Sequence, residues 1–157
     1  MSLTRRAILV SLVLVFSVGC DQATKVVARD RLVGEPMASY FGDTIRIVYA
    51  ENTGAFLSLG ASLPDWLRMA IFIVFVSAFL LGGLWWTLRT PELSRRMIFA
   101  ASLLIGGGIG NLIDRVVFDG RVTDFLNLGV GSLRTGIFNI ADVWIMVGVA
   151  IMLTAPE

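Results

Sequence analysis

The chain has 157 residues, of which 56% are hydrophobic and 16% are charged. A soluble domain of this length would carry roughly 25% charged residues, so the composition favours a membrane protein. The net charge of +1 gives no basis for binding nucleic acid. The chain lacks histidine, and Cys20 is its only cysteine, which excludes histidine-based catalytic triads, internal disulfides and thiolate metal clusters. We expect one domain over residues 1–157, with no metal and no cofactor.

The first apolar run covers residues 7–20 and follows two arginines, as in a secretory signal segment. A signal segment would be followed by a secreted domain, but the rest of this chain consists largely of further apolar runs. We therefore extend the first helix to about residue 28. The extension places Asp21 and Lys25 four positions apart on one helix face, in the order that favours an ion pair.

The segment 30–66 has ordinary polarity. Residues 44–49 are rich in β-branched side chains and lie between turn-forming residues at 42–43 and 52–54. This pattern predicts a short strand or hairpin.

Three further spans follow in the chain. Residues 69–88 form the clearest one, with 20 uncharged residues and tryptophans near both ends. Residues 97–113 form another, and their glycine-rich stretch at 106–110 would let neighbouring helices approach closely. The last predicted span, 136–155, is interrupted only by Asp142. A polar segment, 116–135, connects the predicted spans at 97–113 and 136–155.

The predicted fold is a membrane protein: a four-helix transmembrane bundle with a small extracytoplasmic β-sheet cradle between helices 1 and 2. The arginines before the first span and in the short loop 89–96 favour cytoplasmic termini. A raw count of basic residues opposes this, because the longer segments on the other side hold more of them. With cytoplasmic termini, residues 30–66 and 116–135 would both be extracytoplasmic.

Ionisable groups inside a span are costly, so each one is a candidate functional residue. Asp142 is the strongest, because it would lie six residues into the last span, about 9 Å along the helix axis. Asp114 and Asp124 are the candidate partners. Two nearby carboxylates cannot both ionise cheaply, and such a pair can activate water while polarising a carbonyl. Residue spacing leaves open which of the two acids pairs with Asp142.

Five motifs together resemble lipoprotein signal peptidase, also called signal peptidase II. They occur in the family's order and cover nearly the whole chain. The motifs are DQATK at 21–25, NTGAF at 52–56, GNLIDR at 110–115, VTDF at 122–125 and FNIAD at 138–142.

The resemblance implies a bacterial aspartic endopeptidase of the inner membrane, with both termini in the cytoplasm and its active site near the periplasmic face. It would cut diacylglyceryl-modified prolipoproteins just before the lipidated cysteine. We also expect contact with membrane lipid, inhibition by globomycin-type compounds and a monomeric state. The resemblance assigns catalysis to Asp124 and Asp142, substrate binding to Asn52, Gly54, Asn111, Arg115 and Asn139, and supporting roles to Asp21, Lys25 and Asp114.

Two other hypotheses about function also explain acids inside the membrane spans. In a small proton-coupled transporter or channel subunit, the intramembrane acids would relay protons. In a membrane scaffold, the acids would be structural, and single Asp→Asn changes would leave function intact.

Overall fold

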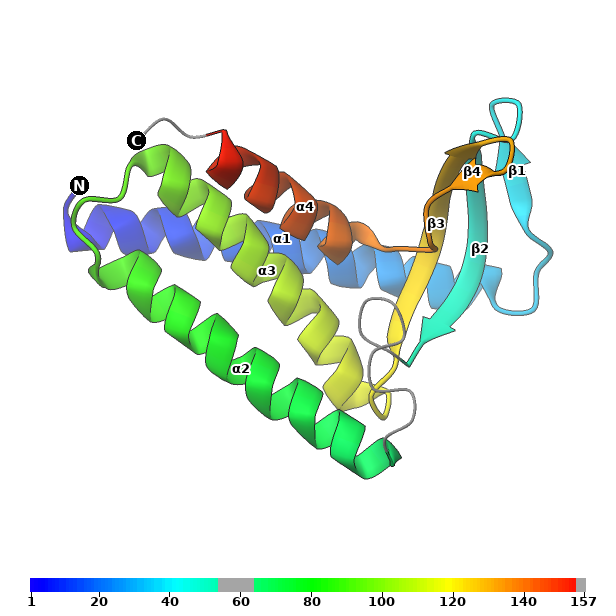
Figure 1. Ribbon diagram of the computed structural model, residues 1–157, viewed down its shortest axis with the longest axis horizontal. Coiled ribbons are helices and arrows are strands. Elements are labelled where there is room, and N and C mark those ends of the chain that lie inside the picture. Colours follow the sequence, from blue (N-terminus) through cyan, green and yellow to red (C-terminus); the bar gives the residue numbers. More distant parts are fainter. Residues whose placement is uncertain (54–63, 155–157) are drawn as a thin grey trace.

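The computed structural model describes residues 1–53 and 64–154. Within these ranges the chain forms four helices and four strands (Figure 1). The helices are α1 (Leu3–Leu32), α2 (Asp65–Arg89), α3 (Arg95–Val117) and α4 (Ile140–Leu153). Figure 1 shows the helices as a bundle with the sheet at one end. The start of α1, the connection from α2 to α3 and the end of α4 lie at the other end.

The helix boundaries follow local capping signals. Ser2 begins α1 by accepting a hydrogen bond from the Arg5 N–H, and Ser94 begins α3 by accepting one from Met97, at 3.4 and 3.1 Å. α1 continues four residues past the predicted end at 28, because its last turns pack against β2 and β3 of the sheet.

Three of the described helices, α1, α2 and α3, are long and apolar enough to cross a membrane. The predicted spans at 69–88 and 97–113 lie inside α2 and α3. α2 also leaves Val74, Phe75 and Phe79 between 60% and 70% exposed. A water-soluble protein rarely exposes such a continuous apolar surface, whereas lipid covers it without cost. The prediction of a membrane protein is therefore confirmed.

The last predicted span is not helical from its start. Residue 136 lies in an extended segment, and α4 begins at Ile140. The extended backbone is held beside the sheet by hydrogen bonds between Phe138 and Leu126 in both directions, each 2.8 Å long. A capping box between Asn139 and Asp142 then starts the helix. Asp142 consequently lies in the first turn of α4, not six residues along a helix.

The sheet is antiparallel with the order β1-β2-β3-β4. β2 (Ile45–Asn52) covers most of the predicted strand or hairpin at 44–49, and β1 (Ala38–Tyr40) precedes it in the same polar segment. β3 (Val122–Val130) and β4 (Leu133–Arg134) come from the connection between α3 and α4, where no strand was predicted. The sheet therefore does not belong only to the connection between the first two helices. It joins both connections, because β2 pairs along its free edge with β3.

A bulge interrupts the pairing of β2 with β3. The partners step from Ile47 and Leu126 to Ala50 and Asp124, so β2 advances by three residues while β3 advances by two. A bulge bends the strand and changes the direction of the side chains beyond it. Beyond this one, the Asn52 side chain reaches the Asp124 carboxylate.

α3 packs against the three other helices, and consecutive glycines make this possible. Successive residues of an α-helix point about 100° apart. A Cβ at Gly106 would overlap Ser17 of α1, one at Gly107 would overlap the Ala141 carbonyl of α4, and one at Gly108 would overlap Leu80 of α2. The three glycines thus let α3 approach a different helix on each side, as the predicted close approach requires.

The contact at Gly107 predicts a stability effect. In Gly107→Ala, the new methyl group would meet backbone atoms of α4, which cannot move away as a side chain can. We expect a loss of about 1–3 kcal/mol, typical of overpacking. The matched control is Gly82→Ala in α2, where no atom lies within 4 Å of the added Cβ. Thermal unfolding in detergent should show a lower Tm for the first variant only, and equal Tm values would contradict the packing described.

Candidate active site

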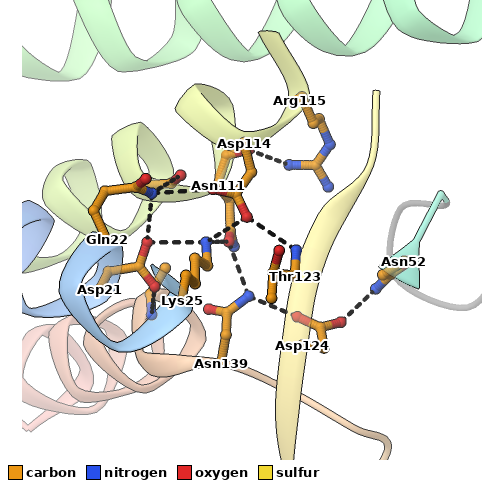
Figure 2. Close-up of polar contacts among 12 residues, drawn as sticks. Asp21, Gln22, Lys25, Asn52, Asn111, Asp114, Arg115, Thr123, Asp124 and Asn139 are labelled. Carbon is orange, nitrogen blue, oxygen red and sulfur yellow. Dashed lines mark hydrogen bonds and ion pairs between the residues drawn. The ribbon is translucent and has the colours of Figure 1, made fainter. Parts of the chain in front are cut away.

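Two acids meet where the sheet joins the helix bundle. Asp124 lies near the start of β3, and Asp142 lies in the first turn of α4. The extended segment before α4 runs beside β3, because the Phe138 carbonyl accepts hydrogen bonds from Phe125 and Leu126 at 3.0 and 2.8 Å. This pairing places Asn139 beside Asp124 (Figure 2). Asp142 follows Asn139 three residues later in the chain.

The Asp124 carboxylate is almost fully buried and accepts two amide hydrogen bonds. Asn139 Nδ2 donates to Oδ1 at 2.6 Å, and Asn52 Nδ2 donates to Oδ2 at 3.1 Å. Burial raises the pKa of Asp124 from 3.8 to about 6, and the charge of Asp142 adds to the rise, while the amide donors oppose it. Asp124 can therefore change its protonation state near neutral pH.

The Asp142 carboxylate also accepts two hydrogen bonds. Asn111 Nδ2 donates to Oδ1 at 2.9 Å, and the Asn139 backbone N–H donates to Oδ2 at 3.0 Å. The orientation of the Asn111 amide follows from its other neighbour. Lys25 Nζ can only donate, and it lies 2.9 Å from Asn111 Oδ1, so the Asn111 amide nitrogen must face Asp142.

A buried charged cluster of Asp21, Lys25 and Asp114 lies behind the two acids. Lys25 Nζ is 2.9 Å from Asp21 Oδ2 and 3.4 Å from Asp114 Oδ2, and all three side chains have zero exposed area. The predicted ion pair between Asp21 and Lys25 is thus confirmed. Charges in an apolar interior require such pairing, because each unpaired ion costs several kcal/mol.

The structure brings together nearly all of the residues predicted for the site. Arg115 lies at its edge, where its guanidinium donates to the Asn111 carbonyl at 3.3 Å and lies 5.5 Å from the centre of the Phe72 ring. Gly54 lies outside the described residues. Asn139 binds both Asp124 and Asp142, whereas Asp114 pairs with Lys25 inside the charged cluster.

Some contributors were missed from the sequence. Gln22 donates to Asp114 at 3.1 Å, and Arg29 donates to the Thr123 hydroxyl at 2.9 Å. Arg29 could have been predicted from the sequence, because it follows Asp21 and Lys25 at four-residue intervals on one face of α1. The backbone N–H groups that complete the site carry no sequence signal.

The buried Asp124 and the partly exposed Asp142 are held by amide donors where the sheet meets an apolar helix bundle, an arrangement typical of a membrane aspartic hydrolase. The family model of signal peptidase (SPase) II matches residues 13–155. The chain therefore belongs to the signal peptidase II family, whose members are aspartic peptidases that remove signal peptides from prolipoproteins.

Individual relatives agree over nearly the full length. The chain is similar to the lipoprotein signal peptidase of Borrelia hermsii, with 31% identity over 98% of this chain and 92% of the relative. It is 32% identical to that of Streptococcus pneumoniae, over 96% of this chain and 93% of the relative. A bacterial membrane enzyme solved by the in meso method at 1.9 Å resolution has a TM-score of 0.79 and 27% identity, covering 92% of this chain and 89% of that one. None of these matches supports the hypothesis of a proton-coupled transporter or channel subunit.

The double role of Asn139 can be separated by substitution. Asn139→Ser keeps an oxygen that can cap α4 but removes the amide donor to Asp124, whereas Asn139→Ala removes both. We expect signal peptide removal to fall roughly 10²-fold in both variants, because the acids lose their orientation. Only the alanine variant should also lose about 1 kcal/mol of stability through the missing cap. Activity assays and thermal unfolding test this, and a serine variant with nearly full activity would contradict the orienting role.

Proposed function

We propose that this protein is a membrane aspartic endopeptidase that cuts diacylglyceryl-modified prolipoproteins just before the lipidated cysteine, with Asp124 and Asp142 as its catalytic pair. The observation that carries the proposal is the position of Asn139 between the two acids. Its side-chain amide binds one carboxylate, and its backbone N–H binds the other. A single residue therefore holds both acids in one fixed arrangement.

The mechanism divides acid and base work between the two carboxyl groups. Asp124, with its pKa raised to about 6, is suited to hold the proton that the pair shares. Asp142 then remains as the carboxylate that takes a proton from water as the water attacks the scissile carbonyl. Asp124 donates its proton to the developing oxyanion. Asp142 then gives its proton to the leaving nitrogen while Asp124 takes its proton back, and the signal peptide is released.

The surrounding residues supply the substrate site. Asn52 and Asn111 each donate to one of the acids, and Arg115 places a positive charge beside them. Gly54 is proposed to line the same site from the segment after β2. The sheet would form the cradle on which the extended peptide around the cleavage site lies, while the signal helix and lipid remain in the bilayer.

The proposal also includes a membrane topology. We propose four crossings of the bacterial inner membrane, with both termini in the cytoplasm and the site near the periplasmic face. α4 has 14 residues, or about 21 Å, which is shorter than a full span. The extended segment before it completes the crossing, and its backbone groups bond to β3 rather than face lipid. We further propose a monomer in contact with membrane lipid and sensitive to globomycin-type inhibitors.

Removing either acid should abolish the chemistry. We expect Asp124→Asn and Asp142→Asn each to lower kcat by about 10²–10⁴-fold in cleavage of a lipid-modified prolipoprotein by the reconstituted protein. Asp30→Asn serves as the matched control, because Asp30 is 72% exposed at the end of α1 and pairs only with the equally exposed Arg31 among described contacts. If either dyad variant cleaves at the control's rate, the catalytic assignment is wrong.

The pH dependence should respond to Asn52. Its hydrogen bond stabilises the ionised form of Asp124 and so lowers a pKa that burial has raised. In Asn52→Ala the pKa should rise further, which moves the limb of the kcat/KM profile near pH 6 to higher pH. Ser39→Ala on β1 is the control, because the exposed Ser39 hydroxyl donates to Asp43, and β1 pairs with β2 rather than with β3. A limb that stays in place, or moves to lower pH, would refute the link between Asn52 and Asp124.

A further inference from the structure

The buried charged cluster binds the backbone immediately before each of the two proposed catalytic acids. Asp21 Oδ1 accepts a hydrogen bond from the Ala141 N–H at 2.9 Å, one residue before Asp142. Asp114 Oδ2 accepts one from the Thr123 N–H at 2.9 Å, one residue before Asp124. Two carboxylates on different helices thus hold the two acid-bearing segments in the same way.

Lys25 joins these two contacts into one unit. Its ammonium lies between the Asp21 and Asp114 carboxylates, at 2.9 and 3.4 Å, and it donates to Asn111, which in turn donates to Asp142. Every charged member of the cluster is fully buried. A buried ion pair of this kind is weak as a source of stability, because apolar residues of similar volume often replace it without loss. A role in fixing geometry explains its presence better.

Both contacts satisfy backbone donors that would otherwise lack partners. The Ala141 N–H belongs to the first turn of α4, where N–H groups have no partner inside the helix and favour a negative charge. The Thr123 N–H is buried at the start of β3. Leaving such a group unpaired costs about 1–3 kcal/mol, so each carboxylate fixes the position of one peptide group.

Gly110 of α3 leaves the space through which the Asp21 side chain reaches α4. A Cβ on Gly110 would overlap Asp21 Oδ2 and would lie 3.0 Å from its Cγ and 3.4 Å from the Ala141 Cβ. Only a glycine at this position leaves room for the Asp21 side chain, which comes from α1, to reach the backbone of α4. The close packing of α1, α3 and α4 at Gly110 therefore allows the hydrogen bond between Asp21 and Ala141.

We propose that Asp21, Lys25 and Asp114 form a positioning unit that sets the separation and orientation of Asp124 and Asp142 by holding the peptide group before each of them. This proposal rests on the proposed function, because it takes these two acids as the catalytic pair. The three residues touch neither substrate nor reacting atoms. They act through Ala141, Thr123 and Asn111, and a displacement of about 1 Å at the acids is enough to cost roughly 10²-fold in rate.

The main test replaces Lys25 by methionine, which keeps an unbranched side chain as far as Cε and removes the ammonium group. We expect kcat to fall roughly 10²-fold with KM within about twofold, because substrate contacts remain while the acids shift. Arg6→Met is the matched control. Arg6 is another buried cation of α1, but it binds the carbonyls of Thr87 and Pro91 at the opposite end of the bundle. Both variants can lower the Tm, but only Lys25→Met should lower kcat per folded molecule.

A second comparison separates hydrogen bonding from folding. Asp114→Asn and Asp21→Asn keep an oxygen that can accept the backbone N–H, whereas the corresponding alanine variants do not. We expect each asparagine variant to retain at least about tenfold more kcat than its alanine counterpart, at equal folded protein. Gly110→Ala should lower kcat as Asp21→Ala does, because its methyl group displaces the same carboxylate.

The outcomes distinguish this proposal from the proposed function. If Lys25→Met has the kcat of the wild type, or if asparagine and alanine variants are equally active per folded molecule, the positioning unit is refuted while the catalytic pair stands. If Asp124→Asn or Asp142→Asn keeps its activity, the catalytic pair itself fails, and the positioning proposal fails with it.

Discussion

Four hydrogen bonds of Asn139 connect the start of a helix, the edge of a sheet and both acids. Its side-chain oxygen accepts the Asp142 N–H, its backbone N–H donates to the Asp142 carboxylate, and its amide nitrogen donates to Asp124 and Asn111. These contacts constrain one another. Because the helix cap uses the amide oxygen, the amide nitrogen must face the acids, and because Phe138 pairs with β3, the cap can form only beside Asp124. The start of α4 and the geometry of the site are therefore one structural feature.

The four described donors that contact the two carboxylates are all neutral N–H groups, three from amide side chains and one from the backbone. An ammonium or guanidinium in direct contact would favour the ionised form of both acids strongly. Lys25 instead lies one residue away, behind Asn111. Neutral donors orient the acids without forcing both to lose their protons, which agrees with the pKa of about 6 for Asp124. The proposed mechanism, in which the pair shares one proton near neutral pH, is compatible with these neutral donors in direct contact.

The features that could be predicted from the sequence are local along the chain. The membrane helices follow from uncharged runs, and the ion pair between Asp21 and Lys25 follows from four-residue spacing on one helix. The pairing of Asp124 with Asp142 could not be read from spacing, because it depends on β3 lying between β2 and the segment before α4. Asn52 and Asp124 are 72 residues apart in the chain, and no local pattern specifies such a contact. The resemblance to a family supplied that pairing. The start of the last helix was misjudged, because the apolar residues 136–138 are compatible with a helix.

The late start of α4 has a chemical consequence for the two acids. Asp142 lies in the first turn, where the unpaired N–H groups of a helix favour negative charge, whereas Asp124 lies in a strand without such a field. The same first turn receives the Asp21 carboxylate at Ala141, so two anions share the positive end of one short helix. Had the helix begun at residue 136, Asp142 would lie in its second turn, with its own N–H bonded inside the helix and no cap to orient it. The extended residues before Asn139 thus give the two acids different surroundings, and the proposed mechanism, in which one carboxyl group acts as acid and the other as base, depends on that difference.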